Sequence, residues 1–304
     1  MIGRTISHYR VVGKLGVGGM GVVYDAEDQN LARKVALKFL PDELAGDPDA
    51  TRRFRREAQT IALLNHPQIC TVYEVDEFED RTFIAMERLE GSNLKAHMAR
   101  KSLDMPEILD IALQIAQALD AAHSKGVIHR DIKPGNVFVS EQGRVKVLDF
   151  GLARRIPSEA SALEMDGSTM PGRPVGTASY MAPERILQLP LDPRCDLFSL
   201  GVVMYEMATG RLPFAAASPA ETVTNILEKE PAPVTALSPN RSGQLDRIIK
   251  KLLAKSAHDR YPSAAALCAD LEGLRAQDTR PTLLGRMFGR FLSTSPRRLP
   301  TRNG

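Results

Sequence analysis

The sequence predicts an α+β protein of two lobes, a small β-rich lobe over residues 1–89 and a larger, mainly helical lobe over residues 90–274. One observation is that residues 9–40 alternate apolar and polar positions and are rich in Val and Gly, which is typical of short antiparallel strands. Another is that the pattern changes at Gly91, after which apolar residues recur with helical spacing from Ile108 to Leu119. No internal repeat is visible.

The small lobe should also contain one helix and two further strands. Residues 48–65 have helical spacing with arginines on the outer side, and Pro67 follows where this helix should end. Strands are expected again at 70–78 and 82–87. We therefore expect one helix to pack beside a small antiparallel sheet.

The first long helix of the larger lobe should end at Gly126, because glycine favours the left-handed conformation that follows many helices. The remaining elements are expected as strands at 137–139 and 145–148, an irregular segment at 155–175, and helices at 195–209, 220–229, 243–254 and 263–275. Long irregular segments within compact domains usually serve function.

Composition and charge narrow the class of protein. The net charge of +3 comes from the last 30 residues, where positions 275–304 hold seven arginines and one aspartate. The body is therefore slightly acidic, and we expect no nucleic-acid binding. The cysteines, Cys70, Cys195 and Cys268, are sparse and odd in number, which favours reduced thiols in the cytoplasm. No apolar run is long enough to span a bilayer, although the chain could be the cytoplasmic domain of a longer membrane protein.

The basic tail, residues 275–304, has an amphipathic pattern. Its apolar residues are separated by Arg286 and Arg290; they are Leu283, Leu284, Met287, Phe288, Phe291 and Leu292. Such a pattern can lie on an anionic membrane surface or dock on a partner. Gly285 and Gly289 disfavour a stable helix, so a flexible linker is the alternative interpretation.

The glycine-rich run Gly16-Val17-Gly18-Gly19-Met20-Gly21 has the spacing G-x-G-x-x-G. Dinucleotide-binding folds use this spacing where a helix follows the glycines, but Val22 and Val23 continue a strand here. Two interpretations remain at this point. One is a strand–loop–strand flap whose backbone N–H groups cover phosphates, with Val23 against a nucleotide base, and the other is a hairpin without a ligand.

Lys38 closes the apolar strand segment Val35–Lys38 and would face inward. A buried ammonium needs a partner of opposite charge. Glu57 lies on the apolar side of the expected helix and is the candidate, although a lone glutamate among arginines is more often a solvated charge. A Lys38–Glu57 pair would hold the ammonium against the α- and β-phosphates of ATP.

The segment His129–Asn136 is the most specific signal in the chain. Within it, Asp131 can orient or deprotonate an incoming hydroxyl, Lys133 can neutralise charge on a moving phosphoryl group, and Asn136 can ligate magnesium. Asp149 follows an apolar strand, where a carboxylate can bind the same hard cation. Polar turn residues without a site are the alternative, but so many matched positions in one loop disfavour it.

In these motifs the chain resembles the eukaryotic-type protein kinase family, and is most similar to its bacterial Ser/Thr receptor-kinase branch. The resemblance covers residues 9–274, and the motifs occur in the family's order. It implies the two-lobed kinase fold, ATP and Mg²⁺ as cofactors, and phosphoryl transfer to Ser/Thr hydroxyls of protein substrates. Lys133 and Gly176-Thr177 resemble the serine/threonine rather than the tyrosine enzymes, whereas Phe198 replaces a more usual tryptophan.

The resemblance also implies roles for individual residues. Catalytic roles fall on Asp131, Lys133, Lys38 and Glu57. Metal ligation falls on Asn136 and Asp149. Nucleotide binding falls on the glycine-rich run (Gly16, Val17, Gly18, Gly19, Met20, Gly21), on Val23, Ala36 and Lys38, on Met86 as gatekeeper with Glu87 and Leu89 in the hinge, and on Phe138 beneath adenine.

Supporting roles are implied as well. Glu184 should pair with Arg260, and Asp196 should brace the catalytic loop. Four residues should stack as a spine in the active state, namely Ile61, Val72, His129 and Phe150. Arg130 should receive a phosphate placed on Ser168 or Thr169, with Thr169 preferred, after two copies of the chain meet as a homodimer.

Two other function classes fit the same fold. A binding-only pseudokinase would lack Lys38, Asp131 or Asp149, and all three residues are present. A small-molecule phosphotransferase would usually lack the peptide-platform motif Ala182-Pro183-Glu184. The sequence therefore favours an active protein kinase.

Overall fold

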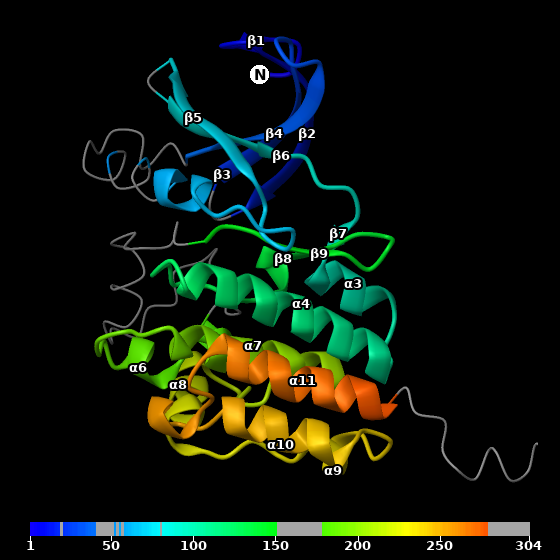
Figure 1. The fold of residues 1–304 in the computed structure, drawn as a ribbon. Coiled ribbons are helices and arrows are strands. Elements are labelled where there is room, and N and C mark those ends of the chain that lie inside the picture. The colour runs from blue at the N-terminus through cyan, green and yellow to red at the C-terminus, as the bar shows by residue number, and fades with distance from the viewer. Residues whose placement is uncertain are drawn as a thin grey trace, which may run out of the picture.

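The computed structural model describes residues 1–18, 21–40, 52, 55, 58–79, 81–150 and 178–278, and it has the two expected lobes (Figure 1). The small lobe lies over the large lobe, and the chain passes between them after strand β6 (Figure 1). The prediction of a β-rich lobe followed by a helical lobe is confirmed.

The small lobe is a six-stranded antiparallel sheet with the strand order β1-β2-β3-β4-β6-β5. Its strands are β1 (Thr5–Ile6), β2 (Tyr9–Gly18), β3 (Gly21–Asp28), β4 (Arg33–Phe39), β5 (Val72–Phe78) and β6 (Arg81–Glu87). Between β4 and β5, the described part of the expected helix is helical at residues 52, 55 and 58–62.

The two faces of this sheet bury different side chains, because neighbouring residues of a strand point to opposite faces. On one face an apolar core contains Val35, Leu37, Phe39, Phe83 and Ala85. The residues between them in β4 and β6 point to the other face, toward the large lobe. The alternation read from the sequence therefore places Lys38 between two core residues but on the opposite side of the sheet.

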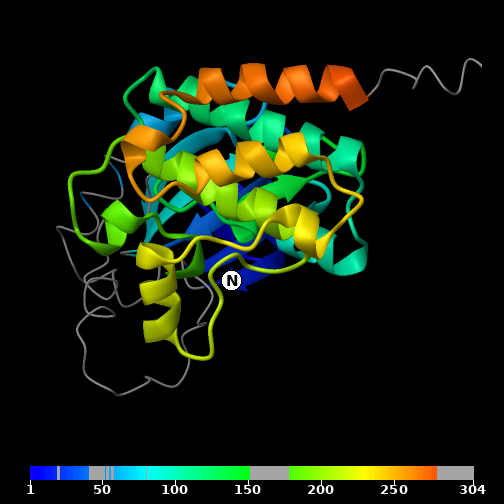
Figure 2. The same ribbon diagram turned by 90° about the horizontal axis from the view of Figure 1, so that it is seen from below.

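The large lobe is built from helices α3 (Leu94–Arg100), α4 (Met105–His123), α6 (Pro183–Ile186), α7 (Arg194–Thr209), α8 (Pro219–Glu228), α9 (Val234–Leu237), α10 (Gly243–Leu252) and α11 (Ala264–Asp278). Helix α7 is buried on nearly all sides, which agrees with its nearly uniform apolar sequence. Helix α11 lies along α4 in both views (Figures 1 and 2).

Local signals explain where these helices begin and end. The Asp104 carboxylate accepts a hydrogen bond from the Glu107 N–H at 2.9 Å and so caps the start of α4. Helix α7 ends at Gly210, whose φ of 69° lies in the left-handed region that favours glycine. The helix expected over 263–275 extends to Asp278, and Arg275 on its last turns contacts Asp110 of α4 at 3.1 Å.

A second, three-stranded sheet lies where the lobes meet. It consists of β7 (Ser92–Asn93), β8 (Val137–Val139) and β9 (Val145–Val147). Gly91 precedes it with φ 134°, and a Cβ there would lie 2.3 Å from the carbonyl oxygen of Val139. Among the residues that the structure describes, none of the helices has the length and apolar character needed to cross a bilayer.

Candidate active site

The loop between α4 and β8, residues 129–136, is held in place by a buried carboxylate, that of Asp196. Asp196, which is fully buried at the start of α7, accepts the backbone N–H of His129 at 2.8 Å and that of Arg130 at 2.7 Å. His123 at the end of α4 contacts the same carboxylate at 2.9 Å. The loop therefore takes its position from the core of the large lobe.

The ionised form of Asp196 is favoured despite its burial. Burial by itself would raise the pKa of Asp196, but the hydrogen bonds from His123 and from the His129 N–H outweigh it, so that the pKa lies below its usual range. A carboxylate that accepts several hydrogen bonds is a stable acceptor for the loop.

The side chain of His129 adds a second constraint on the loop. Its Nε2 donates to the carbonyl oxygen of Leu148 at 2.8 Å, and its Nδ1 accepts the N–H of Asp131 at 3.1 Å. These two bonds match one tautomer of the neutral ring, with the proton on Nε2. His129 thus links Leu148, the residue that follows β9, to the loop at residues 129–136.

Three of the predicted catalytic and metal residues meet in this loop. Oδ2 of Asp131 lies 2.7 Å from Nζ of Lys133 and accepts Nδ2 of Asn136 at 2.8 Å. Asn136 Nδ2 also donates to the Asp131 carbonyl oxygen at 2.8 Å, so Asp131 accepts two hydrogen bonds from this amide nitrogen. Oδ1 of Asp131 takes part in no hydrogen bond among the described residues, and can face an incoming hydroxyl.

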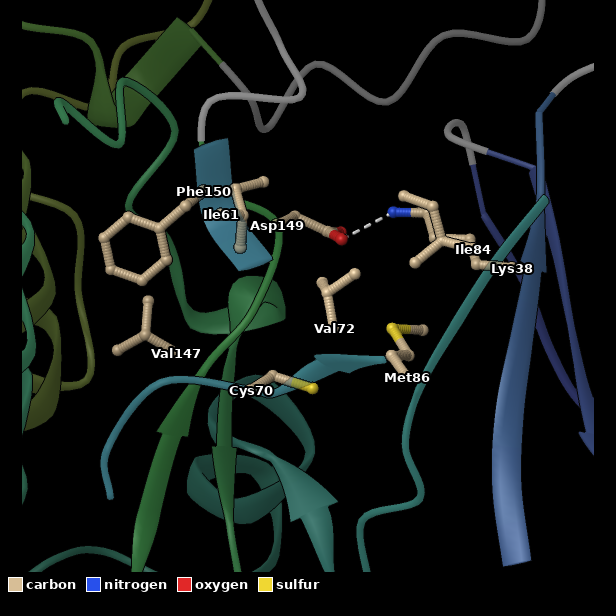
Figure 3. A pocket seen from close by; sticks show the side chains of 9 residues that line it. All are labelled: Lys38, Ile61, Cys70, Val72, Ile84, Met86, Val147, Asp149 and Phe150. Carbon is tan, nitrogen blue, oxygen red and sulfur yellow. Dashed lines mark ion pairs between the residues drawn. The ribbon is translucent and has the colours of Figure 1, made fainter. Parts of the chain in front are cut away.

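Asp149, which follows β9, connects this site to the small lobe through Lys38. Its Oδ1 lies 2.7 Å from Nζ of Lys38, and both side chains are largely buried (Figure 3). Asp149 has φ 60°, a left-handed conformation that turns the chain after β9 and directs the carboxylate toward Lys38. The expected partner of Lys38, Glu57, lies outside the described residues, so that pairing stays a prediction.

The predicted nucleotide-binding residues of strands β3, β4 and β6 share one face of the small-lobe sheet. Val23 pairs with Lys38, and Ala36 pairs with Met86, across neighbouring strands. Residues paired in this way point to the same face. Val23, Ala36, Lys38 and Met86 therefore all face the large lobe, where Asp149 lies.

The glycine-rich run forms the end of a hairpin. Gly16 and Val17 in β2 pair with Val23 and Val22 in β3, and Gly18 pairs with Gly21. Because a strand follows the glycines, the dinucleotide-binding alternative is excluded. Gly19 and Met20 lie outside the described residues.

The expected hinge and the floor residue lie at the junction of the lobes. Glu87 ends β6, and Leu89 follows it in the connection to the large lobe. Phe138 is in β8, half-buried, and paired with Asn93 and Lys146 of its neighbouring strands. These positions agree with the assigned roles, which stay predictions.

A pocket lies between the sheet residues Lys38, Ile84 and Met86 and the ring of Phe150 (Figure 3). Three of the expected spine residues line it together, namely Ile61, Val72 and Phe150. The fourth, His129, contacts the Phe150 ring with 4.6 Å between ring centroids. The other lining residues are Lys38, Cys70, Ile84, Met86, Val147 and Asp149.

The predicted Glu184–Arg260 pair is present. The buried guanidinium of Arg260 donates to both carboxylate oxygens of Glu184, at 2.7 and 2.9 Å. It also lies over the ring of Phe198, 4.9 Å from the centroid, so the phenylalanine that replaces tryptophan still contacts this cation.

Arg130 precedes Asp131, the predicted catalytic aspartate, and one nitrogen of its side chain has no hydrogen bond within the described part of the chain. Its Nε is buried and has no hydrogen-bond partner among the described residues. Its carbonyl oxygen accepts a hydrogen bond from Arg185 of α6. The proposed phosphate acceptors Ser168 and Thr169, the Gly176-Thr177 motif and the tail from 279 onward lie outside the described residues.

Sequence reasoning missed several contacts of this site. Neither His123, which bonds Asp196, nor Lys146, which lies 2.7 Å from Glu87 Oε2, was singled out. Each partner is far away along the chain, and neither residue belongs to a recognisable motif. A charged residue in a short buried strand, such as Lys146 in β9, was the available signal.

Comparison with known proteins agrees with this geometry. The protein kinase domain family matches residues 9–271. A probable serine/threonine-protein kinase PknB of Corynebacterium glutamicum is 37% identical over 272 residues, which are 86% of this chain and 41% of that protein. A probable serine/threonine-protein kinase of Streptomyces coelicolor is 40% identical, covering 88% of this chain and 40% of that protein.

Solved structures give the same result. The PknI kinase domain of Mycobacterium tuberculosis is similar with a TM-score of 0.73 and 30% identity, over 91% of this chain and 99% of that domain. The chain spans about two fifths of the length of the curated relatives that it matches. The predicted family and fold are confirmed, and the chain belongs to the protein kinase family.

Proposed function

We propose that this chain is a serine/threonine protein kinase catalytic domain that transfers the γ-phosphoryl group of Mg²⁺-bound ATP to protein hydroxyls. The observation that carries the proposal is the meeting of two groups of residues. Asp131, Lys133 and Asn136 are bonded together in one loop. Lys38 and Asp149 lie 2.7 Å apart across the lobes, and the N–H of Leu148, the residue before Asp149, donates to the carbonyl oxygen of Asn136 at 2.8 Å.

Each of these residues can supply one part of phosphoryl transfer. The oxygen of the substrate hydroxyl bonds to the γ-phosphorus, and the bond from the γ-phosphorus to the β–γ bridging oxygen breaks. Asp131 accepts the proton that the hydroxyl loses. Lys133 stabilises negative charge on the transferred group. Lys38 binds the phosphates that stay with ADP.

The oxygens of Asn136 and Asp149 suit magnesium. Mg²⁺ binds hard oxygen ligands and commonly takes one or two from the protein and the rest from phosphates and water. The amide nitrogen of Asn136 is held by Asp131, and its oxygen accepts no hydrogen bond from the described residues. When bound, the ion neutralises the phosphates.

A binding-only module is the second candidate function. It is disfavoured because Lys38, Asp131 and Asp149 are all present and within bonding distance of site partners. The names of the similar proteins, serine/threonine-protein kinases, support activity on protein hydroxyls. We place this activity in the cytoplasm, where ATP is available.

The domain should also phosphorylate its own activation segment. Arg130 is a cation whose Nε has no partner among the described residues, and a phosphate on Ser168 or Thr169 would supply one. Two copies of the chain would have to meet for this reaction, so its rate should rise with protein concentration. Contact of the basic tail with anionic membrane remains a separate proposal.

Phosphosite mapping tests the proposal. The wild-type chain and Asp131→Asn would each be incubated with Mg²⁺-ATP and casein, and the products mapped by mass spectrometry. Phosphoserine or phosphothreonine on casein from the wild type alone supports the proposal. Transfer to small alcohols but not to protein, or equal products from Asp131→Asn, would contradict it.

Activation of the kinase by phosphorylation of its own activation segment is tested separately. A Ser168→Ala, Thr169→Ala double variant would be dephosphorylated, reactivated with ATP and assayed on casein. We expect it to regain little activity. Recovery equal to wild type, with the same lag, would show that phosphorylation of Ser168 or Thr169 does not activate the kinase.

A further inference from the structure

The end of β6 is held by several contacts at one residue, Glu87. The N–H of Glu87 donates to the Thr71 carbonyl at 2.9 Å, and its carboxylate accepts the Thr71 N–H at 3.3 Å. Its carbonyl oxygen lies 3.8 Å from the thiol of Cys70. Each polar group of Glu87 therefore has a partner in the segment before β5.

Lys146 adds the only ionic partner that the described residues give to Glu87. Its Nζ lies 2.7 Å from Glu87 Oε2 and also donates to the Ile69 carbonyl at 3.2 Å. Lys146 is in β9, which belongs to the large lobe, whereas Glu87 ends a strand of the small lobe. One ammonium thus bonds both the end of β6 and the segment that leads into β5.

The same segment is bonded to the backbone of β9. The N–H of Cys70 donates to the Val147 carbonyl at 3.0 Å, and the N–H of Val147 donates to the Gln68 carbonyl at 2.8 Å. Lys146 therefore projects from a strand that already contacts residues 68–70. Three segments far apart in the sequence meet at this lysine.

The environment makes the pair more than an ordinary surface contact. The side chains of Lys146 and Glu87 are 22% and 27% exposed, so bulk water screens them only in part. At 2.7 Å the bond is a short, charge-assisted one. Loss of the ammonium would leave the Glu87 carboxylate with the single, longer bond from the Thr71 N–H.

We propose that Lys146 is a positioning residue for the nucleotide: by holding Glu87, it fixes the backbone that contacts adenine. The inference rests on the proposed function, because it needs the residues after β6 to bind the adenine of ATP. Lys146 itself need not touch the nucleotide. Its effect should therefore fall on nucleotide affinity and not on the chemical step.

The test compares Lys146→Met and Lys146→Arg with the wild type. Lys146→Met should raise the KM for ATP and the Kd for Mg²⁺-ADP by about three- to tenfold, with kcat within about twofold of wild type. Lys146→Arg, which keeps the charge, should restore most of the affinity. A residue with a merely structural role would lower the melting temperature without this separation of KM from kcat.

Two further variants make the result specific. Lys101→Met removes a similar ammonium, 2.9 Å from Glu107, on the surface of the large lobe, and should leave both constants unchanged. Glu87→Gln should weaken ADP binding as Lys146→Met does, and the double variant should be no worse than either single one. If Lys146→Met does not fold, Glu87→Gln carries the comparison.

The outcomes separate this inference from the proposed function. If wild type binds Mg²⁺-ADP and Lys146→Met binds it equally well, the positioning role is wrong while the proposed function stands. If the two single effects add in the double variant, the pair does not act as a unit and the inference also fails. If wild type binds no nucleotide, the proposed function is wrong, and the inference about Lys146 is wrong as well.

Discussion

The ammonium of Lys38 lies 2.7 Å from the carboxylate of Asp149, so an ion pair joins the small lobe to the large lobe at the centre of the site. Both residues were expected to serve ATP, one through its phosphates and the other through magnesium. In the structure they are partners of each other. A bound Mg²⁺-nucleotide would place cation and phosphates beside both.

Asp149→Ala should weaken nucleotide binding only when magnesium is present. The variant loses an oxygen ligand for Mg²⁺, and we expect at least about tenfold weaker ADP binding by calorimetry in magnesium, with little change in EDTA. Asp192→Ala, which removes an aspartate that pairs with Arg194 in the large lobe, is the control. Equal loss of affinity in EDTA would show that Asp149 does not act through the metal.

Asp131→Asn should separate binding from turnover. The amide keeps the shape of the side chain but cannot accept the proton of the hydroxyl, so kcat should fall by about 10²- to 10⁴-fold. ADP affinity should stay near that of wild type. Near wild-type phosphorylation of a Ser/Thr peptide would show that Asp131 is not the catalytic carboxylate.

Asp196→Asn should destabilise the large lobe and alter its response to acid. The pKa of Asp196 is lowered in the folded chain, so the unfolded chain binds more protons as the pH falls below about 4. The stability that the carboxylate contributes is therefore present above that pH and lost below it. The variant should lose on the order of 3 kcal/mol of unfolding free energy near pH 7 and show a shallower loss below pH 4. Urea titrations from pH 3 to 7 would measure both.

Arg260→Lys should also cost stability, because an ammonium cannot donate two parallel bonds to Glu184. We expect a loss of about 2 kcal/mol in the free energy of unfolding, since the site is buried. Glu79→Gln, which breaks an exposed pair with Arg4, should change stability little. Equal effects from the two variants would argue against a special role for the buried pair.

The cysteines should resist alkylation in the folded chain. Burial, followed by the charges of Glu87 and Asp149, raises the pKa of Cys70 to about 12, and burial raises that of Cys268 to about 11. At pH 8 the Cys70 thiol therefore stays in its protonated, unreactive form. Iodoacetamide should label the native chain slowly and the urea-unfolded chain rapidly. Rapid native labelling of Cys70 would mean that the segment before β5 opens readily.

Local patterns were enough to predict most of the fold. The apolar spacing from Ile108 to Leu119 predicted helix α4, and Gly126, the residue expected to end it, has φ 73° three residues past its last residue, His123. The predicted end of α11, Arg275, fell three residues before the observed end at Asp278, and the packing of this helix along α4 includes the contact of Arg275 with Asp110. That contact joins residues 165 positions apart, and no local pattern encodes it.

The residues of the candidate site also fall into those that the sequence predicted and those that it did not. Asp131, Lys133 and Asn136 could be found because they lie within one short loop and their side chains bond to each other. Lys146 could not, since its partner Glu87 is 59 positions away and their approach depends on how β9 meets the segment before β5. The bond from His123 to Asp196 spans 73 positions and was missed because His123 belongs to no family motif, whereas the Glu184–Arg260 pair, 76 positions apart, was predicted from motif residues.

The two N–H groups that Asp196 accepts have a consequence for how long the catalytic loop keeps its shape. The amide hydrogens of His129 and Arg130 point at a carboxylate with no exposed surface, inside the most buried helix of the large lobe. They can meet solvent only when that helix separates from the loop, so their hydrogen exchange should be as slow as that of the large-lobe core. The catalytic loop should then keep its shape through every motion of the small lobe, for as long as the large lobe stays folded.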